Sequence, residues 1–165
     1  MLVHLKKITL TEVTAGREQD ALPESRSWRV FSVAKDCSFE HCEIYAQIEG
    51  LSSKEDQRSA LSALTKLLKV AHTGDPLEVH YDKKQCHELF RFHYKGKERT
   101  VWRLRNASVR IPFYYAKGKI LFLPGIVVKR RDKLKKYEES ALAKEVERLI
   151  DAEESETLVI QADTQ

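Results

Sequence analysis

The 165-residue sequence has no long apolar run and no internal repeat. A membrane-spanning helix needs about 18 consecutive apolar residues, whereas the longest apolar stretch, Ile120–Val128, contains Pro124 and Gly125. We therefore expect no membrane contact. The first ten residues are too polar for the apolar core of a secretory signal, so a cytoplasmic protein is expected.

Cysteine is also scarce, with Cys37, Cys42 and Cys86 as the three examples. An odd number without a secretory signal argues against a disulfide framework and favours reduced thiols. With His41 and His87 these cysteines could supply zinc ligands, but their spacing matches no standard zinc motif. We expect buried cysteines, and neither a metal nor another cofactor.

Charge of one sign is concentrated in the middle of the chain. Residues 83–136 contain 17 Lys and Arg but 3 Asp and Glu, a net charge of +14. Residues 1–82 carry −3 and residues 137–165 carry −7, so the whole chain is at +4. A basic block inside an otherwise acidic chain is typical of proteins that bind polyanions, although a solvated charged surface is the alternative.

Hydrophobic periodicity predicts helices first and strands later. Asp36 is placed to cap a short helix ending at Gly50, and Ser52 or Ser53 to cap a second helix that Gly74 and Pro76 stop. Alternating or apolar runs predict strands at 28–33, 89–94, 99–105, 109–115 and 120–128, and a last helix is expected over about 133–151. Residues 2–13 alternate loosely and are a candidate edge strand.

This order predicts an α+β fold, in which a helical hairpin packs on a twisted antiparallel sheet that a C-terminal helix follows. We divide the chain into an N-terminal extension (1–27), a main domain (28–151) and a flexible acidic tail (152–165). Trp102 and Phe113 belong to the apolar face of the sheet and are interpreted as core residues, whereas Tyr114 and Tyr137 are candidate platforms for stacked bases.

Basic side chains alternate with these apolar ones. Arg103, Arg105 and Arg110 lie on the strands, and a second cluster follows the last strand: Lys129, Arg130, Arg131, Lys133, Lys135 and Lys136. Because a hairpin joins the strands concerned, both groups can meet at one end of the sheet. Guanidinium groups at fixed positions suit phosphate binding, and the sequence predicts an RNA or phosphate site there.

Three motifs follow one another in this part of the chain: Val-Trp-Arg-Leu-Arg (101–105), Arg-Ile-Pro-Phe-Tyr-Tyr (110–115), and the run from Lys119 to Arg131 that precedes a charged helix. Together they resemble the RelE/HigB toxins of the RelE/ParE toxin superfamily. The resemblance covers about residues 28–151 and is sharp from Val101 to about Glu147. It implies a metal-independent endoribonuclease that cleaves mRNA, usually on the ribosome, and an acidic antitoxin as partner; the oligomeric state stays open.

The same resemblance implies roles for single residues. Arg110 would hold the scissile phosphate, Arg130 would stabilise the leaving oxygen, and Tyr137 would lie near the nucleophile. Arg103 stands where some members place a lysine that acts as base, but an arginine is always protonated and is a poor base. Lys133, Tyr137 and His93 are the substitutes, and no choice among them is forced.

Two other functions stay open at this stage. The same superfamily includes ParE-like toxins, which poison gyrase by binding and do no phosphate chemistry. A basic RNA-binding accessory protein without toxicity is the third alternative, which the missing lysine favours. The set of Arg103, Arg110 and Arg130 favours the ribonuclease over the gyrase binder.

Overall fold

The computed structural model describes residues 2–22, 24–129 and 134–161. Its helices are α1 (Leu10–Val13), α2 (Glu43–Glu49), α3 (Lys54–His72) and α4 (Lys136–Glu154), with short 3-10 helices at Phe39–His41 and Leu77–His80. Its strands are β1 (Val3–Lys7), β2 (Arg29–Val33), β3 (Cys86–Tyr94), β4 (Lys97–Asn106), β5 (Val109–Ala116), β6 (Ile120–Phe122), β7 (Val127–Val128) and β8 (Leu158–Ile160).

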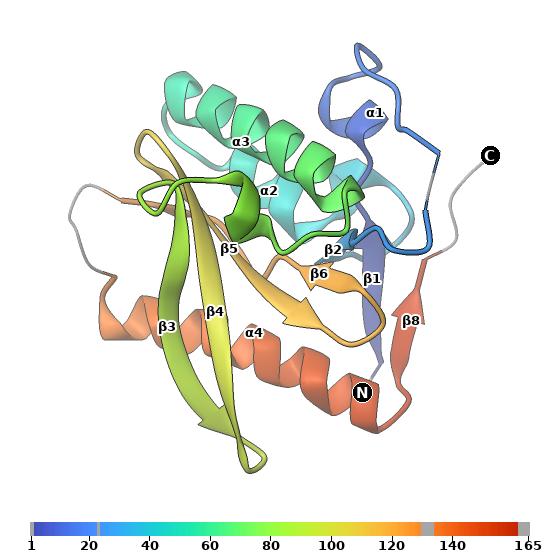
Figure 1. Cartoon of the computed structure of the whole chain (residues 1–165), viewed down its shortest axis with the longest axis vertical. Coiled ribbons are helices and arrows are strands. Elements are labelled where there is room, and N and C mark those ends of the chain that lie inside the picture. The colour runs from blue at the N-terminus through green and yellow to red at the C-terminus, as the bar shows by residue number, and fades with distance from the viewer. Residues whose placement is uncertain (1, 23, 130–133, 162–165) are drawn as a thin grey trace.

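These strands form one mixed sheet, so the predicted fold class is wrong. The strand order is β3-β4-β5-β6-β2-β1-β8, with β7 added to β5. The β3–β6 meander is antiparallel, but β2 pairs with β6 in parallel and β1 pairs with β8 in parallel. Figure 1 shows the long β3–β4 hairpin at one side of the molecule and β1 and β8 at the other. The sheet is thus large and eight-stranded, rather than a small antiparallel sheet under a helical hairpin.

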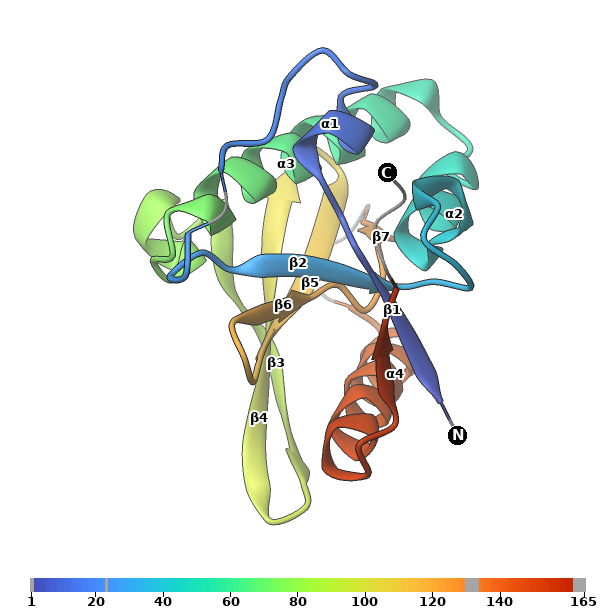
Figure 2. The same cartoon turned by 90° about the vertical axis from the view of Figure 1, so that its right-hand side faces the viewer.

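Helices cover both faces of the sheet. In Figure 2, α1, α2 and α3 lie above β2 and β5, and α4 lies on the opposite side. Successive side chains of β5 point to opposite faces of the sheet. Phe113 and Tyr115 pack in the core under α2 and α3, whereas Tyr114 packs in the core against α4. Arg110 and Arg103 have the strand parity of the α4 face, and this parity decides where the basic residues lie.

Helix α3 shows how local chemistry sets the elements. The Ser53 side chain accepts a hydrogen bond from the Asp56 backbone N–H at 3.2 Å and caps the helix. Ala60, Leu64 and Leu67 are buried at helical spacing. The helix ends before Gly74, which has a φ of +81°. By contrast, Asp36 caps no α-helix: it accepts from the Ser38 backbone N–H, and α2 begins later, at Glu43.

Both ends of the chain contribute to the sheet. Strand β1 lies between β2 and β8, so it is no edge strand, and Leu5 pairs with Val33 on one side and Ile160 on the other. Within the expected acidic tail, α4 continues to Glu154 and β8 follows. Residues 17–22 and 24–28 contain no helix or strand and pass over α3. Across the described part of the chain, no helix has the length and apolar character to cross a membrane.

Candidate nucleic-acid interface

The register of β4 against β5 brings three arginines together. Arg105 lies directly opposite Arg110, and Arg103 lies opposite Pro112, two residues further along the same pair of strands. Side chains two residues apart on a strand point to the same face, so Arg103 and Arg105 share a face with Arg110. Residues that are far apart in an extended chain are thereby collected at one end of the sheet.

These arginines line a cleft of about 520 Å³. Its lining is His87, Leu89, Arg103, Arg105, Arg110, Lys129, Leu134 and Glu139. The residues come from β3, β4 and β5, from the positions just after β7 and just before α4, and from the first turn of α4, and Figure 1 shows the N-terminal end of α4 beside the β3–β4 hairpin. We call this feature the arginine cleft. Among the described lining residues, four side chains are cationic and one is a carboxylate, which favours a positive potential.

Arg103 is fixed in the wall of this cleft. Its side chain is buried, and it donates hydrogen bonds to the backbone carbonyls of Lys84 (3.0 Å) and Gln85 (3.4 Å). Burial lowers the pKa of the guanidinium, and the positive charges of Arg110 and Arg105 lower it further. A bound anion would relieve both effects, so the arrangement favours phosphate binding.

Arg110 and Lys129 are anchored from the β4–β5 turn. Arg110 is 9% exposed and donates to the carbonyl of Ala107 at 2.7 Å. The Lys129 backbone N–H donates to the carbonyl of Ser108 at 2.8 Å. The start of the second basic cluster is therefore tied to the turn between the arginine-bearing strands, as the sequence predicted for one end of the sheet.

His87 and Glu139 are functional candidates that the sequence did not single out for this site. His87 pairs with Arg103 in the β3–β4 register, and its Nε2 is hydrogen bonded to the Arg103 guanidinium. A guanidinium only donates, so Nε2 must accept, and Nδ1 donates to the Glu88 carbonyl at 2.6 Å. The ring is then the neutral Nδ1–H tautomer. Glu139 adds a carboxylate, the one acidic side chain among the described lining residues.

Other predicted residues lie away from the arginine cleft. Tyr137 is 69% exposed and lines a different cleft beside Pro124 and Gly125. Two helical residues correspond to about 200° around the axis, so Tyr137 and Glu139 face in different directions. Lys135 is the N-cap of α4 and Lys136 is its first residue; both are exposed. The predicted grouping of Tyr137 with the arginines is thus wrong.

Tyr114 and His93 are also misplaced for their predicted roles. Tyr114 is buried in the core against α4, and its hydroxyl accepts from Arg99 at 3.3 Å, so no base can stack on it. His93 lies on the distal part of the hairpin, 4.0 Å from Glu98. Phe113 is confirmed as a core residue, and Trp102 is partly buried and packs against the same core. Arg130, Arg131 and Lys133 lie outside the described residues.

The cysteines are dispersed. Cys42 and Cys86 are buried and Cys37 is partly exposed, all as free thiols. Burial raises the thiol pKa of Cys42 and raises that of Cys86 to about 12, so neither is a reactive thiolate at neutral pH. Over the ranges that the structure describes, no three His, Cys, Asp or Glu side chains are grouped to hold a metal ion.

Comparison of the chain with protein-family models, with curated proteins and with solved structures finds no significant match. The resemblance to RelE/HigB toxins therefore rests on the sequence motifs alone.

Proposed function

We propose that this protein is an RNA-directed endoribonuclease, acting as the toxin of a toxin–antitoxin system. The observation that carries the proposal is the convergence of Arg103, Arg105, Arg110 and Lys129 in one cleft with His87 and Glu139. Cations that surround a phosphodiester stabilise the extra negative charge of a pentacoordinate phosphorane. A carboxylate in the same cleft supplies the proton acceptor that the arginines cannot supply.

In the proposed reaction, the 2′-oxygen of the RNA attacks the adjacent phosphorus and the bond to the 5′-oxygen breaks, which leaves a 2′,3′-cyclic phosphate. Glu139 takes the proton of the 2′-hydroxyl. Arg103 and Arg110 hold the non-bridging oxygens, and Lys129 donates a proton to the departing 5′-oxygen. Arg103 is not the base, because it stays protonated and donates to fixed carbonyls.

The partners follow from the same proposal. Single-stranded mRNA, read on the ribosome, is the substrate, and the site is cytoplasmic. An acidic antitoxin would cover the arginine cleft by charge complementarity. The toxin assignment rests on the resemblance of residues 101–131, whereas RNA binding rests on the charge of the cleft.

The decisive experiment combines induced expression with cleavage of a labelled RNA by the purified protein. We expect Glu139→Gln to reduce cleavage by about 100-fold or more while RNA binding persists. Tyr137→Phe and Lys144→Ala, an exposed change on α4 away from the cleft, should cleave normally. Full cleavage by Glu139→Gln would exclude this mechanism, and cleavage products with a 3′-hydroxyl would exclude attack by the 2′-oxygen.

A second candidate function, RNA binding without cleavage, is favoured by one observation. The lone pair of His87 Nε2 is already used by Arg103, so among the lining residues that the structure describes only Glu139 is left as a proton acceptor. In that case the wild-type protein would bind RNA and yield no new 5′ ends in primer extension of total mRNA.

A further inference from the structure

His87 stands where β3 meets the guanidinium groups of the arginine cleft. It is exposed, lies opposite Arg103 in the β3–β4 register and lines the cleft. The ring accepts a hydrogen bond from Nη2 of Arg103 at Nε2 and donates one from Nδ1 to the Glu88 carbonyl at 2.6 Å. Both ring nitrogens are therefore engaged while the ring is neutral, and a proton can add only at the lone pair that faces Arg103.

Arg103 cannot easily move away from this ring. Its Nη1 donates to the carbonyls of Lys84 at 3.0 Å and Gln85 at 3.4 Å, and its side chain is buried. The neutral His87 ring is thus the acceptor that occupies the remaining terminal nitrogen, Nη2. Whether Nη2 is available to a ligand depends on the state of the His87 ring.

Charged groups reach the cleft from each element around His87. Among the described lining residues these are Arg103 and Arg105 of β4, Arg110 of β5, Lys129 after β7 and Glu139 of α4. Titratable side chains on or beside β3 that do not line the cleft have partners of their own: Glu88 with Arg91, Glu78 with the Tyr115 hydroxyl, His80 with Asp75, and Asp151 and Glu154 with Lys95. The groups that share the cleft with His87 are thus mainly cationic.

Protonation of the ring and binding of an anion therefore favour each other. With the cleft empty, a proton on Nε2 would set an N–H donor and a positive charge against the Arg103 guanidinium, which is unfavourable. An anion between the two groups accepts from both and screens their charges. Linkage is reciprocal, so an anion that favours the protonated ring is bound more tightly by the protonated protein.

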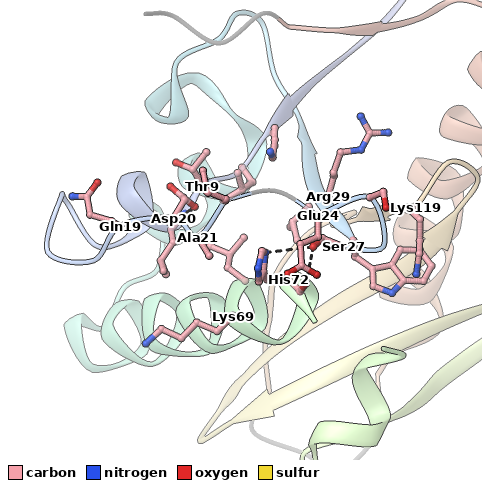
Figure 3. Close-up of a pocket in the computed structure, with 18 of the residues that line it drawn as sticks. Thr9, Gln19, Asp20, Ala21, Glu24, Ser27, Arg29, Lys69, His72 and Lys119 are labelled. Atoms are coloured by element: carbon pink, nitrogen blue, oxygen red, sulfur yellow. Dashed lines mark hydrogen bonds between the residues drawn. The ribbon is translucent and has the colours of Figure 1, made fainter. Parts of the chain in front are cut away.

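His72 provides a contrast in the cleft between α1 and α3. Its Nδ1 lies 3.4 Å from the Ser27 hydroxyl, which donates to the His72 carbonyl at 2.6 Å (Figure 3). The two clefts share no described lining residue. The His72 ring meets a hydroxyl where the His87 ring meets a guanidinium, so a proton on His72 should have no effect on an anion in the arginine cleft.

We propose that His87 makes anion binding in the arginine cleft proton-linked, with the anion held between the Arg103 guanidinium and the protonated His87 ring. The neutral ring occupies one donor of Arg103, whereas the protonated ring leaves that donor to the anion and adds a donor of its own. This inference rests on the proposed function, because the occupant is taken to be a phosphate group of RNA. It adds that the protein binds this substrate more tightly in mildly acidic solution and takes up a proton as it does so.

The test is isothermal titration calorimetry of the full chain with sodium sulfate at about pH 8 and about pH 5, the range in which histidine changes its charge. The ionic strength is the same in both buffers. Sulfate is the probe because its charge is constant over this range, whereas a phosphate monoester titrates within it. We expect the Kd to be about tenfold lower at the lower pH, a usual size for coupling between two linked sites.

Three substitutions identify the group that takes up the proton. His87→Gln keeps an acceptor for Arg103 but cannot become charged, so its sulfate affinity should be the same at both pH values. His93→Gln changes an exposed histidine on the distal part of the same strand and should keep the tenfold ratio. Glu139→Gln should bind more tightly at both pH values and keep the ratio, because a glutamate takes up its proton mainly below about pH 5.

Four results would overturn the inference: no sulfate binding at either pH, a wild-type affinity that is independent of pH, a ratio that persists in His87→Gln, or a ratio that is lost in His93→Gln or Glu139→Gln. The measurement does not depend on RNA cleavage. Proton-linked sulfate binding by a protein that cleaves no RNA would support the inference and reject the proposed nuclease. Cleavage of RNA together with pH-independent sulfate binding would reject the inference and leave the nuclease in place.

Discussion

Arg105 and Arg110 lie directly opposite each other across the β4–β5 ladder. Like charges at opposed positions of an antiparallel pair destabilise the sheet by up to about 1 kcal/mol. Arg103, on the same face, adds to this repulsion and has its pKa lowered by burial and by both neighbours. The fold thus tolerates a local electrostatic cost at the place where we propose that phosphate binds.

The first prediction concerns Arg105→Gln. Arg105 is exposed, and its backbone N–H still donates to the Gln85 carbonyl, so the change removes charge and leaves the ladder intact. We expect a rise of about 0.5 kcal/mol in the free energy of unfolding, or about 1–2 °C in Tm, with weaker RNA binding. Arg91→Gln is the control, because Arg91 is paired with Glu88 and Glu98 and should gain no stability. A lower Tm for Arg105→Gln would contradict the repulsion.

The second prediction is that sulfate stabilises the protein specifically. A dianion that bridges Arg103, Arg105 and Arg110 binds the folded state, and at ten times its Kd it adds about 1.4 kcal/mol. Calorimetry in about 10 mM sulfate, compared with chloride at equal ionic strength, should show Tm higher by a few degrees. The gain should be smaller in Arg105→Gln, and an equal gain in that variant would place sulfate elsewhere.

Local patterns in the sequence predicted the parts of the fold that local chemistry sets. Hydrophobic periodicity, a cap at Ser52 or Ser53 and the stop at Gly74 predicted α3, and Ser53 is the cap that the structure shows. Strand β8, with three residues, has too little pattern to be read. The parallel pairings of β1 with β8 and β2 with β6 join distant segments, and no local signal encodes them.

The candidate site, too, was predictable from the sequence only in part. Alternation along β4 and β5 placed Arg103, Arg105 and Arg110 on one face, because strand parity is a property of the sequence. His87 reaches the cleft through the β3–β4 register, which a bulge between Glu88 and Phe90 shifts. Glu139 reaches it through the docking of α4. Tyr137 was expected in the site from its place in the chain, but α4 turns it toward Pro124.

The third prediction uses the contact between the hairpin tip and α4. The Tyr94 hydroxyl donates to the Asp151 carboxylate at 2.6 Å, and this bond, with Lys95 at 3.0 Å, lowers the pKa of Asp151. A carboxyl group that is more acidic when folded stabilises the protein above its unfolded pKa of about 4. That contribution is lost as the pH falls through the folded-state pKa.

Asp151→Asn should therefore lower Tm at pH 7, and the difference from wild type should shrink toward zero as the pH is lowered from about 4 to 2. The measurement is thermal unfolding of both proteins across that range. A difference that stays constant down to the lowest pH would show that the ionised carboxylate is not the stabilising form.

The last prediction separates backbone strain from steric conflict at two glycines of similar φ. Gly74 has a φ of +81°, and a Cβ there would lie 2.4 Å from the Arg26 carbonyl oxygen. Gly96 has a φ of +76°, and a Cβ there would meet no atom within 4 Å.

Gly96→Ala should lower the free energy of unfolding by about 1 kcal/mol, the cost of a left-handed conformation for an L-residue. Gly74→Ala should cost clearly more in urea unfolding, because the segment that carries Arg26 must also move. Equal stability losses in the two variants would mean that the Arg26 carbonyl does not pack against Gly74 in solution.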